Sequence, residues 1–102
     1  MSFYVHIPTP KVKTYYMTCS ACPSQWEGTL EGGGHLYIRY RWGGISLYVG
    51  KDLQDCFEQG PIFTNDFADS LDGVMDDETM KFATGHILDW SEAERIPVPE
   101  EE

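Results

Sequence analysis

The fold of this chain is decided by a stretch in its middle, Ile38-Arg39-Tyr40-Arg41-Trp42-Gly43-Gly44-Ile45-Ser46-Leu47-Tyr48-Val49. Apolar and polar residues alternate on both sides of Gly43-Gly44, which is the pattern of two strands joined by a two-residue type I′ turn. The pairs that this turn predicts on the apolar side are Trp42 with Ile45, Tyr40 with Leu47 and Ile38 with Val49. A shift by one residue would place Arg39 and Arg41 among the apolar side chains, so we expect this division of the two faces to be strongly specified.

A third strand precedes the hairpin, because residues 25–30 alternate in the same way, with Trp26 and Leu30 on the apolar face. The glycine-rich residues 31–34 have to form a longer loop or a bulge. A two-residue turn would place apolar residues of the first strand opposite polar residues of the second. If Leu30 pairs with Leu36, Glu27 lies opposite Arg39, which predicts a cross-strand ion pair. We therefore expect an antiparallel β-meander with strands near residues 25–30, 35–42 and 45–50.

Two more strands are predicted before the meander, at residues 3–7 and 12–19, on either side of a Pro8-Thr9-Pro10 turn. After the meander the apolar spacing becomes helical in three places. A short helix carries Leu53, Cys56 and Phe57 and ends at Gly60, a turn from Asp66 to Gly73 carries Phe67 and Leu71, and a segment starting near Asp76 directs Met80, Ala83 and Ile87 inward. The prediction is a single α+β domain over residues 1–96, a meander packed by short C-terminal helices, with an acidic flexible tail at residues 97–102.

Charge divides the chain into two unlike halves. The net charge of -10 is the sum of +2 on residues 1–50 and -12 on residues 51–102. The acidic half would repel a nucleic-acid duplex and attract a basic protein surface. We therefore expect no direct nucleic-acid binding and a basic protein surface as partner.

The location of the protein is predicted from what its sequence lacks. Residues 1–10 have neither the basic nor the apolar region of a signal peptide, and no stretch approaches the roughly 20 apolar residues that span a bilayer. Cys19, Cys22 and Cys56 are an odd number, which suits a reducing compartment. We expect a cytoplasmic protein without membrane contact, and the sequence does not indicate its oligomeric state.

The pair Cys19 and Cys22 has the C-x-x-C spacing of zinc and redox sites. A closed zinc site needs four ligands, and no second C-x-x-C or H-x-x-x-H follows. Cys56 with one of the three histidines would complete a site only if folding brought them together. The favoured interpretation is buried or turn cysteines with no metal or cofactor, and a structural zinc module through Cys19 and Cys22 is an alternative.

A run of six acids lies between residues 66 and 78. It does not fit an EF-hand, because with Gly73 as the sixth loop residue the first, third and twelfth are Ala68, Ser70 and Thr79. Helix capping by Asp66 and Asp76 accounts for some of these carboxylates. The run is nevertheless predicted as the protein-docking surface, with the residues Asp66, Asp69, Asp72, Asp76, Asp77 and Glu78.

The polar face of the central hairpin is the candidate ligand site. At period two it gathers guanidinium, phenol, imidazole and hydroxyl groups, which recognise phosphate, carboxylate and aromatic bases; the residues are His35, Tyr37, Arg39, Arg41, Ser46 and Tyr48. Such a face would bind a nucleotide or a similar small anion. In the competing interpretation, helices from the second half cover this face and their carboxylates neutralise Arg39 and Arg41.

No nucleophile elbow, P-loop, dinucleotide fingerprint or H-E-x-x-H motif occurs, and the three histidines lie on different segments, so we do not expect an enzyme. The runs Cys22-Pro23-Ser24-Gln25-Trp26-Glu27-Gly28 and Tyr37-Ile38-Arg39-Tyr40-Arg41-Trp42-Gly43 resemble short uncharacterised proteins of bacteria and their phages. The resemblance covers about a quarter of the chain and implies no activity. Size and acidity also resemble small phage proteins that block host enzymes or defence systems. The leading hypothesis is a small acidic inhibitor or adaptor that docks on a basic protein surface.

Overall fold

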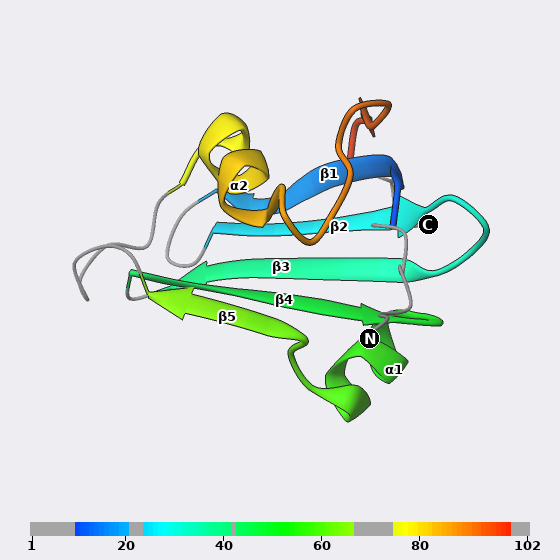
Figure 1. Ribbon diagram of the computed structural model, residues 1–102, viewed down its shortest axis with the longest axis horizontal. Coiled ribbons are helices and arrows are strands. Elements are labelled where there is room, and N and C mark those ends of the chain that lie inside the picture. The colour runs from blue at the N-terminus through cyan, green and yellow to red at the C-terminus, as the bar shows by residue number, and fades with distance from the viewer. Residues whose placement is uncertain (1–9, 21–23, 42, 67–74, 99–102) are drawn as a thin grey trace, which may run out of the picture.

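A computed structural model describes residues 10–20, 24–41, 43–66 and 75–98. These residues form a six-stranded sheet of order β5-β4-β3-β2-β1-β6 and two short helices (Figure 1). The elements are β1 (Val12–Ser20), β2 (Ser24–Leu30), β3 (His35–Arg41), β4 (Gly44–Gly50), α1 (Leu53–Gln59), β5 (Phe63–Asp66), α2 (Asp77–Thr84) and β6 (Glu94–Arg95). Strands β1 to β5 pair antiparallel, and β6 pairs parallel to β1. The predicted α+β fold, a meander packed by helices, is confirmed.

The central hairpin has the predicted faces but not the predicted pairs. Tyr40 lies opposite Ile45 and Ile38 opposite Leu47, so the register is shifted by two residues from the expected one. The turn precedes Gly44, and Gly43 supplies its positive φ of 75°. This register pairs β3 and β4 over their full length, from His35 with Gly50 to Arg41 with Gly44. Because side chains alternate with period two, the shift leaves the described residues of β3 and β4 on their expected faces. The predicted pair of Trp42 with Ile45 involves a residue outside the described ranges.

The connection between β2 and β3 is the longer loop that the sequence requires. Residues 31–34 form it, and its three glycines have φ values of 87°, 97° and 130°, a region that other residues rarely adopt. Here too the register differs by two residues, since Leu36 pairs with Gly28 and Glu27 with Tyr37. The predicted pair of Leu30 with Leu36 and the ion pair of Glu27 with Arg39 are therefore wrong.

The core lies on one face of the sheet, beneath α2 and the segment that follows it. Six side chains from β2, β3 and β4 are almost completely buried there: Trp26, Leu36, Ile38, Tyr40, Ile45 and Leu47. Met80 of α2 and Leu88 close over them, with Ala83 and Ile87 packed at the margin. Asp76 caps α2 as predicted, because its carboxylate accepts the N–H of Thr79 over 2.8 Å. Burying these apolar surfaces is what fixes α2 on this face.

The structure does not describe two of the predicted segments and contains two strands that the sequence did not predict. The strand at 3–7 and the turn carrying Phe67 and Leu71 lie outside the described residues. The edge strands β5 and β6 were not expected, and Pro97 and Val98 of the predicted tail are exposed. Within the described ranges, no helix is long and apolar enough to cross a membrane.

Candidate functional site

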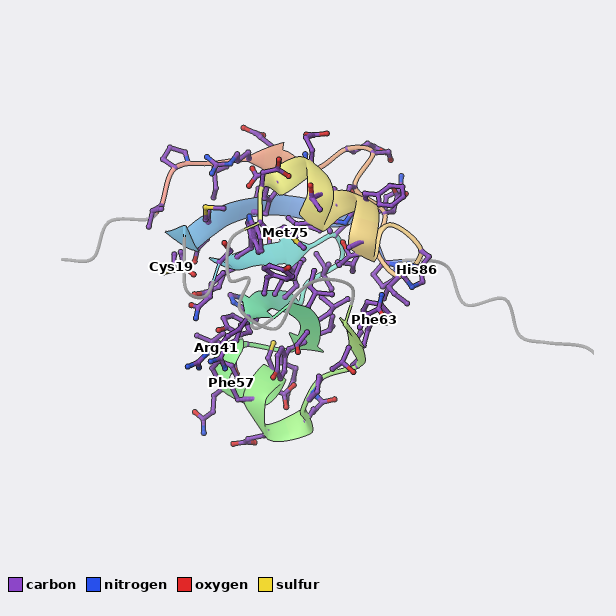
Figure 2. The ribbon with its side chains drawn as sticks, turned by 90° about the vertical axis from the view of Figure 1, so that its left-hand side faces the viewer. Cys19, Arg41, Phe57, Phe63, Met75 and His86 are labelled. Atoms are coloured by element: carbon purple, nitrogen blue, oxygen red, sulfur yellow. The ribbon has the colours of Figure 1, made fainter. Side chains whose placement is uncertain are left out.

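The side of the sheet opposite the core, called the outer face here, carries the predicted ligand residues. Alternation along β3 and β4 places them in neighbouring cross-strand rows: Tyr37 opposite Tyr48, Arg39 opposite Ser46, and Arg41 opposite Gly44. Figure 2 shows Arg41 and Phe57 on one side of the sheet and Phe63 and His86 on the other. The outer face therefore runs from an aromatic end near α1 to a cationic end at the β3–β4 turn.

The aromatic end is a cluster of three rings, Tyr37, Tyr48 and Phe57. Their centroids lie 5.5 Å apart for Tyr37 and Tyr48, 5.0 Å for Tyr37 and Phe57, and 5.9 Å for Tyr48 and Phe57. Tyr37 is the inner member with 7% of its surface exposed, and this burial raises the pKa of its phenol. Phe57 is 52% exposed. The helical spacing predicted Phe57 on the same face as the buried Cys56, but its ring caps the two tyrosines from the solvent side.

Helix α1 is what places Phe57 there. Asp52 caps its first turn by accepting the N–H of Asp55 over 2.8 Å, and Gly60 ends it at a φ of 80°. The helix lies directly on Gly50 at the end of β4, where a Cβ would come within 2.7 Å of the Cys56 nitrogen. A residue without a side chain at position 50 thus allows α1 to sit close to the sheet.

The cationic end contains a hollow of about 320 Å³, called the arginine groove here, lined by Arg39, Arg41, Gly44, Ser46 and Tyr48. The Nε of Arg39 is buried and has no hydrogen-bond partner among the residues that the structure describes. A buried donor without an acceptor is costly, and a cationic one more so. Among the described residues of the outer face, this nitrogen is therefore the buried side-chain donor that lacks a hydrogen bond.

Within the described residues, the competing structural interpretation, coverage of this face by helices, is seen at one end only. Helix α1 contacts β3 and β4 and covers Tyr37 with Phe57. At the other end, no carboxylate of the described ranges forms an ion pair with Arg39. Arg41 is exposed. The expected neutralisation of Arg39 by acids of the second half is not seen in the part of the chain that is described.

His35 lies apart from the groove, in a polar cluster with Glu27 and Tyr16. Its Nε2 is 3.1 Å from Glu27 Oε1, and the Tyr16 hydroxyl donates to the same carboxylate oxygen over 3.5 Å. Burial and the neighbouring Glu27 raise the pKa of Tyr16. Four of the six predicted ligand residues thus line the groove, Tyr37 lies in the ring cluster, and His35 belongs to this separate network.

Two acids of the predicted docking surface stabilise the fold itself. Asp76 caps α2, and the hydroxyl and N–H of Thr79 lower its pKa. Asp77 accepts a hydrogen bond from Trp26 Nε1 and forms an ion pair with Arg95. Glu78 is exposed, 3.9 Å from Lys81 Nζ. Asp66 is the last residue of β5, and Asp69 and Asp72 lie outside the described residues.

The cysteines form no site in the described part of the chain. Cys56 is buried under α1 and its thiol donates to the His35 carbonyl over 3.5 Å; burial, followed by the nearby Asp55 and Asp52, raises its pKa. Cys19 is half-buried, and Cys22 is not among the described residues. No group of three or more His, Cys, Asp or Glu side chains could hold a metal ion within the described ranges. The zinc alternative stays a prediction.

Comparison of the chain with protein-family models, with curated proteins and with solved structures found no match.

Proposed function

We propose that this chain is a non-enzymatic binding protein whose arginine groove holds a small anion through a phosphate or carboxylate group. The observation that carries the proposal is the Arg39 Nε, a buried cationic donor without an acceptor among the described residues. A guanidinium offers its donors in a planar fork that fits two oxygens of a phosphate or carboxylate. Arg39 lines the groove, so an oxyanion bound there would meet its guanidinium, whose Nε lacks an acceptor among the described residues.

The other groups around the hollow support the same chemistry. Arg41 contributes a second guanidinium from the next row, and Ser46 contributes a hydroxyl that donates readily to an anion. Gly44 has no side chain, so an approaching oxyanion can come close to the strand. In a chain with net charge -10, two arginines at one end of the outer face form a local positive site in a negative surface.

The proposal is tested by isothermal titration calorimetry with inorganic phosphate and with acetate at constant ionic strength. We expect one site per chain for at least one of the two anions. Arg39→Gln should weaken binding by at least about tenfold, since a hydrogen bond to a charged group contributes roughly 1.5–3 kcal/mol. Arg95→Gln is the matched control, because Arg95 pairs with Asp77 away from the groove. Equal affinity in both variants, or no binding of either anion, would contradict the proposal.

A second function is favoured by the charge distribution: docking of an acidic surface on a basic protein, as an inhibitor or adaptor would do. Residues 51–102 carry a net charge of -12, and among the described acids Asp76 and Glu78 are both exposed at the start of α2. Complementary charge speeds association and orients the partners. The phage-type role as a host-factor or defence antagonist and the cytoplasmic location are parts of this second proposal.

Its test uses poly-L-lysine as the basic probe. The double variant Asp76→Asn with Glu78→Gln removes two charges and keeps the helix cap, because Asn caps as well as Asp. Its control, Glu31→Gln with Glu58→Gln, removes two exposed charges elsewhere. Binding should weaken more in the first variant and should fall as salt shortens the Debye length. Equal losses in both variants would mean that no docking surface exists at α2.

A further inference from the structure

Resting on the proposed anion site, we infer that the ligand is a mononucleotide, with its phosphate in the arginine groove and its base against Tyr48 and Phe57. Two observations that the anion proposal does not use point to an aromatic half of the ligand. One is the adjacency of the groove and the ring cluster, which share Tyr48. The other is the 52% exposure of Phe57 beside them.

The spacing of the rows suits such a ligand. The Arg39–Ser46 row and the Tyr37–Tyr48 row are neighbours on the same face, two residues apart along each strand. Two residues of an extended strand span about 7 Å. A phosphate held at the first row therefore has its aromatic contact one row away, and a pentose is a connector of that size. A phosphate joined directly to a ring would reach this contact less well.

The ring cluster is also built to stay in place. Tyr37 is buried between its neighbours and holds Tyr48 and Phe57 at edge or tilted angles of 58° to 74°. Figure 2 shows Phe57 and Arg41 on the same side of the sheet, so both halves of a ligand would approach from one direction. Rings fixed in this way lose little conformational freedom when a base packs against them. Any of the bases can pack on an aromatic ring, because each has a flat aromatic face.

Charge and size select a single nucleotide over a nucleic acid. The net charge of -10 repels a polyanion, and each phosphate added beyond the first would have to find a further cation. The hollow of about 320 Å³ is at the small end of ligand sites. A nucleoside monophosphate satisfies both limits, whereas a strand of several nucleotides does not.

The test compares five probes by calorimetry: inorganic phosphate, ribose 5-phosphate, adenosine 5′-monophosphate, phenyl phosphate and an adenine hexanucleotide. The nucleotide should bind at least about tenfold tighter than ribose 5-phosphate, the gain expected for one base on an aromatic side chain. Phe57→Leu should remove most of that difference and leave the affinity for ribose 5-phosphate unchanged. Phe82→Leu is the matched control, because Phe82 is 87% exposed on α2.

The outcomes separate the two proposals. If ribose 5-phosphate and the nucleotide bind equally and Arg39→Gln weakens both, the anion site stands and the mononucleotide inference is wrong. Phenyl phosphate binding as tightly as the nucleotide would also overturn the inference, since no sugar would then be needed. If none of the phosphates binds, the mononucleotide inference is wrong, and if acetate does not bind either, the anion site itself fails. An adenine hexanucleotide that binds tighter than the mononucleotide would show a polyanion ligand instead.

Discussion

The indole Nε1 of Trp26 donates a hydrogen bond to Oδ1 of Asp77 over 2.9 Å and joins the middle of the sheet to the first turn of α2. Trp26 is fully buried, and the Asp77 side chain is 21% exposed. The same carboxylate also pairs with Arg95 of β6. Asp77, which the sequence predicts as part of a protein-docking surface, thus connects β2, α2 and β6.

Asp77→Ala should lower the free energy of unfolding by about 1–3 kcal/mol, because the buried indole N–H of Trp26 loses its acceptor. Urea unfolding followed by tryptophan fluorescence measures the change. Glu78→Ala is the control, since Glu78 is exposed and surface substitutions usually stay within about 0.5 kcal/mol. Similar stability of the two variants would show that the Trp26–Asp77 bond contributes little.

Gly50→Ala should displace α1 and cost about 1–3 kcal/mol, the usual range for overpacking. The added Cβ would lie 2.7 Å from the Cys56 nitrogen and 2.8 Å from Asp55 Oδ2. The specific readout is the nuclear Overhauser contact between the Tyr48 and Phe57 rings, which should weaken. Gly32→Ala strains its own backbone but meets no atom within 4 Å, so it should leave that contact intact. An unchanged ring contact in Gly50→Ala would argue against this account of α1 placement.

Cys56 should resist alkylation in the folded protein and react quickly in urea. Burial raises the pKa of its thiol, and Asp55 and Asp52 raise it further, so little reactive thiolate forms near neutral pH. Iodoacetamide labelling followed by peptide mass spectrometry gives the rate at each cysteine under both conditions. Comparable rates for Cys56 with and without urea would contradict its placement beneath α1.

Asp76 should make stability depend on pH in the acid range. The hydroxyl and N–H of Thr79 lower the pKa of Asp76 from its usual value of 3.8. The stability that the ionised carboxylate gives to the folded protein is therefore complete above pH 3.8. The contribution is then lost as the pH falls through the lower pKa of the folded state. Asp76→Asn keeps a cap that does not titrate. The difference in unfolding free energy between the two proteins, measured from about pH 6 to pH 2, should be constant above the unfolded pKa and change below it. A difference that is flat throughout would mean that the carboxylate is not engaged.

The division of the sheet into two faces could be predicted from the sequence, and the register could not. Alternation has period two, so a shift of two residues leaves the apolar pattern unchanged. Pairing of β3 with β4 over their whole length, as in Tyr40 with Ile45, is a property of the folded hairpin. Strand β6 has two residues and no periodicity of its own. It forms where the chain beyond α2 returns to β1.

The candidate site was predictable to the same extent. Arg39, Arg41, Ser46 and Tyr48 lie on the same face of the hairpin, and a register shift of two residues keeps them there. This is why these four residues line one hollow. What covers them depends on contacts between distant segments. Phe57 reaches Tyr37 and Tyr48 because α1 packs on Gly50, and Asp77 reaches Trp26 across 51 positions of sequence. Local patterns carry no signal for either contact.

The most direct test of the anion site is the nuclear magnetic resonance signal of the Arg39 Nε–Hε group during separate titrations with inorganic phosphate and with acetate at constant ionic strength. The chain has three arginines, so each signal can be assigned by substitution. With at least one of the two anions, the account predicts a saturable shift of the Arg39 signal and slower exchange of its proton with water, while the Arg95 signal stays in place. An Arg39 signal that does not move in either titration, or that moves only in parallel with Arg95, would contradict it.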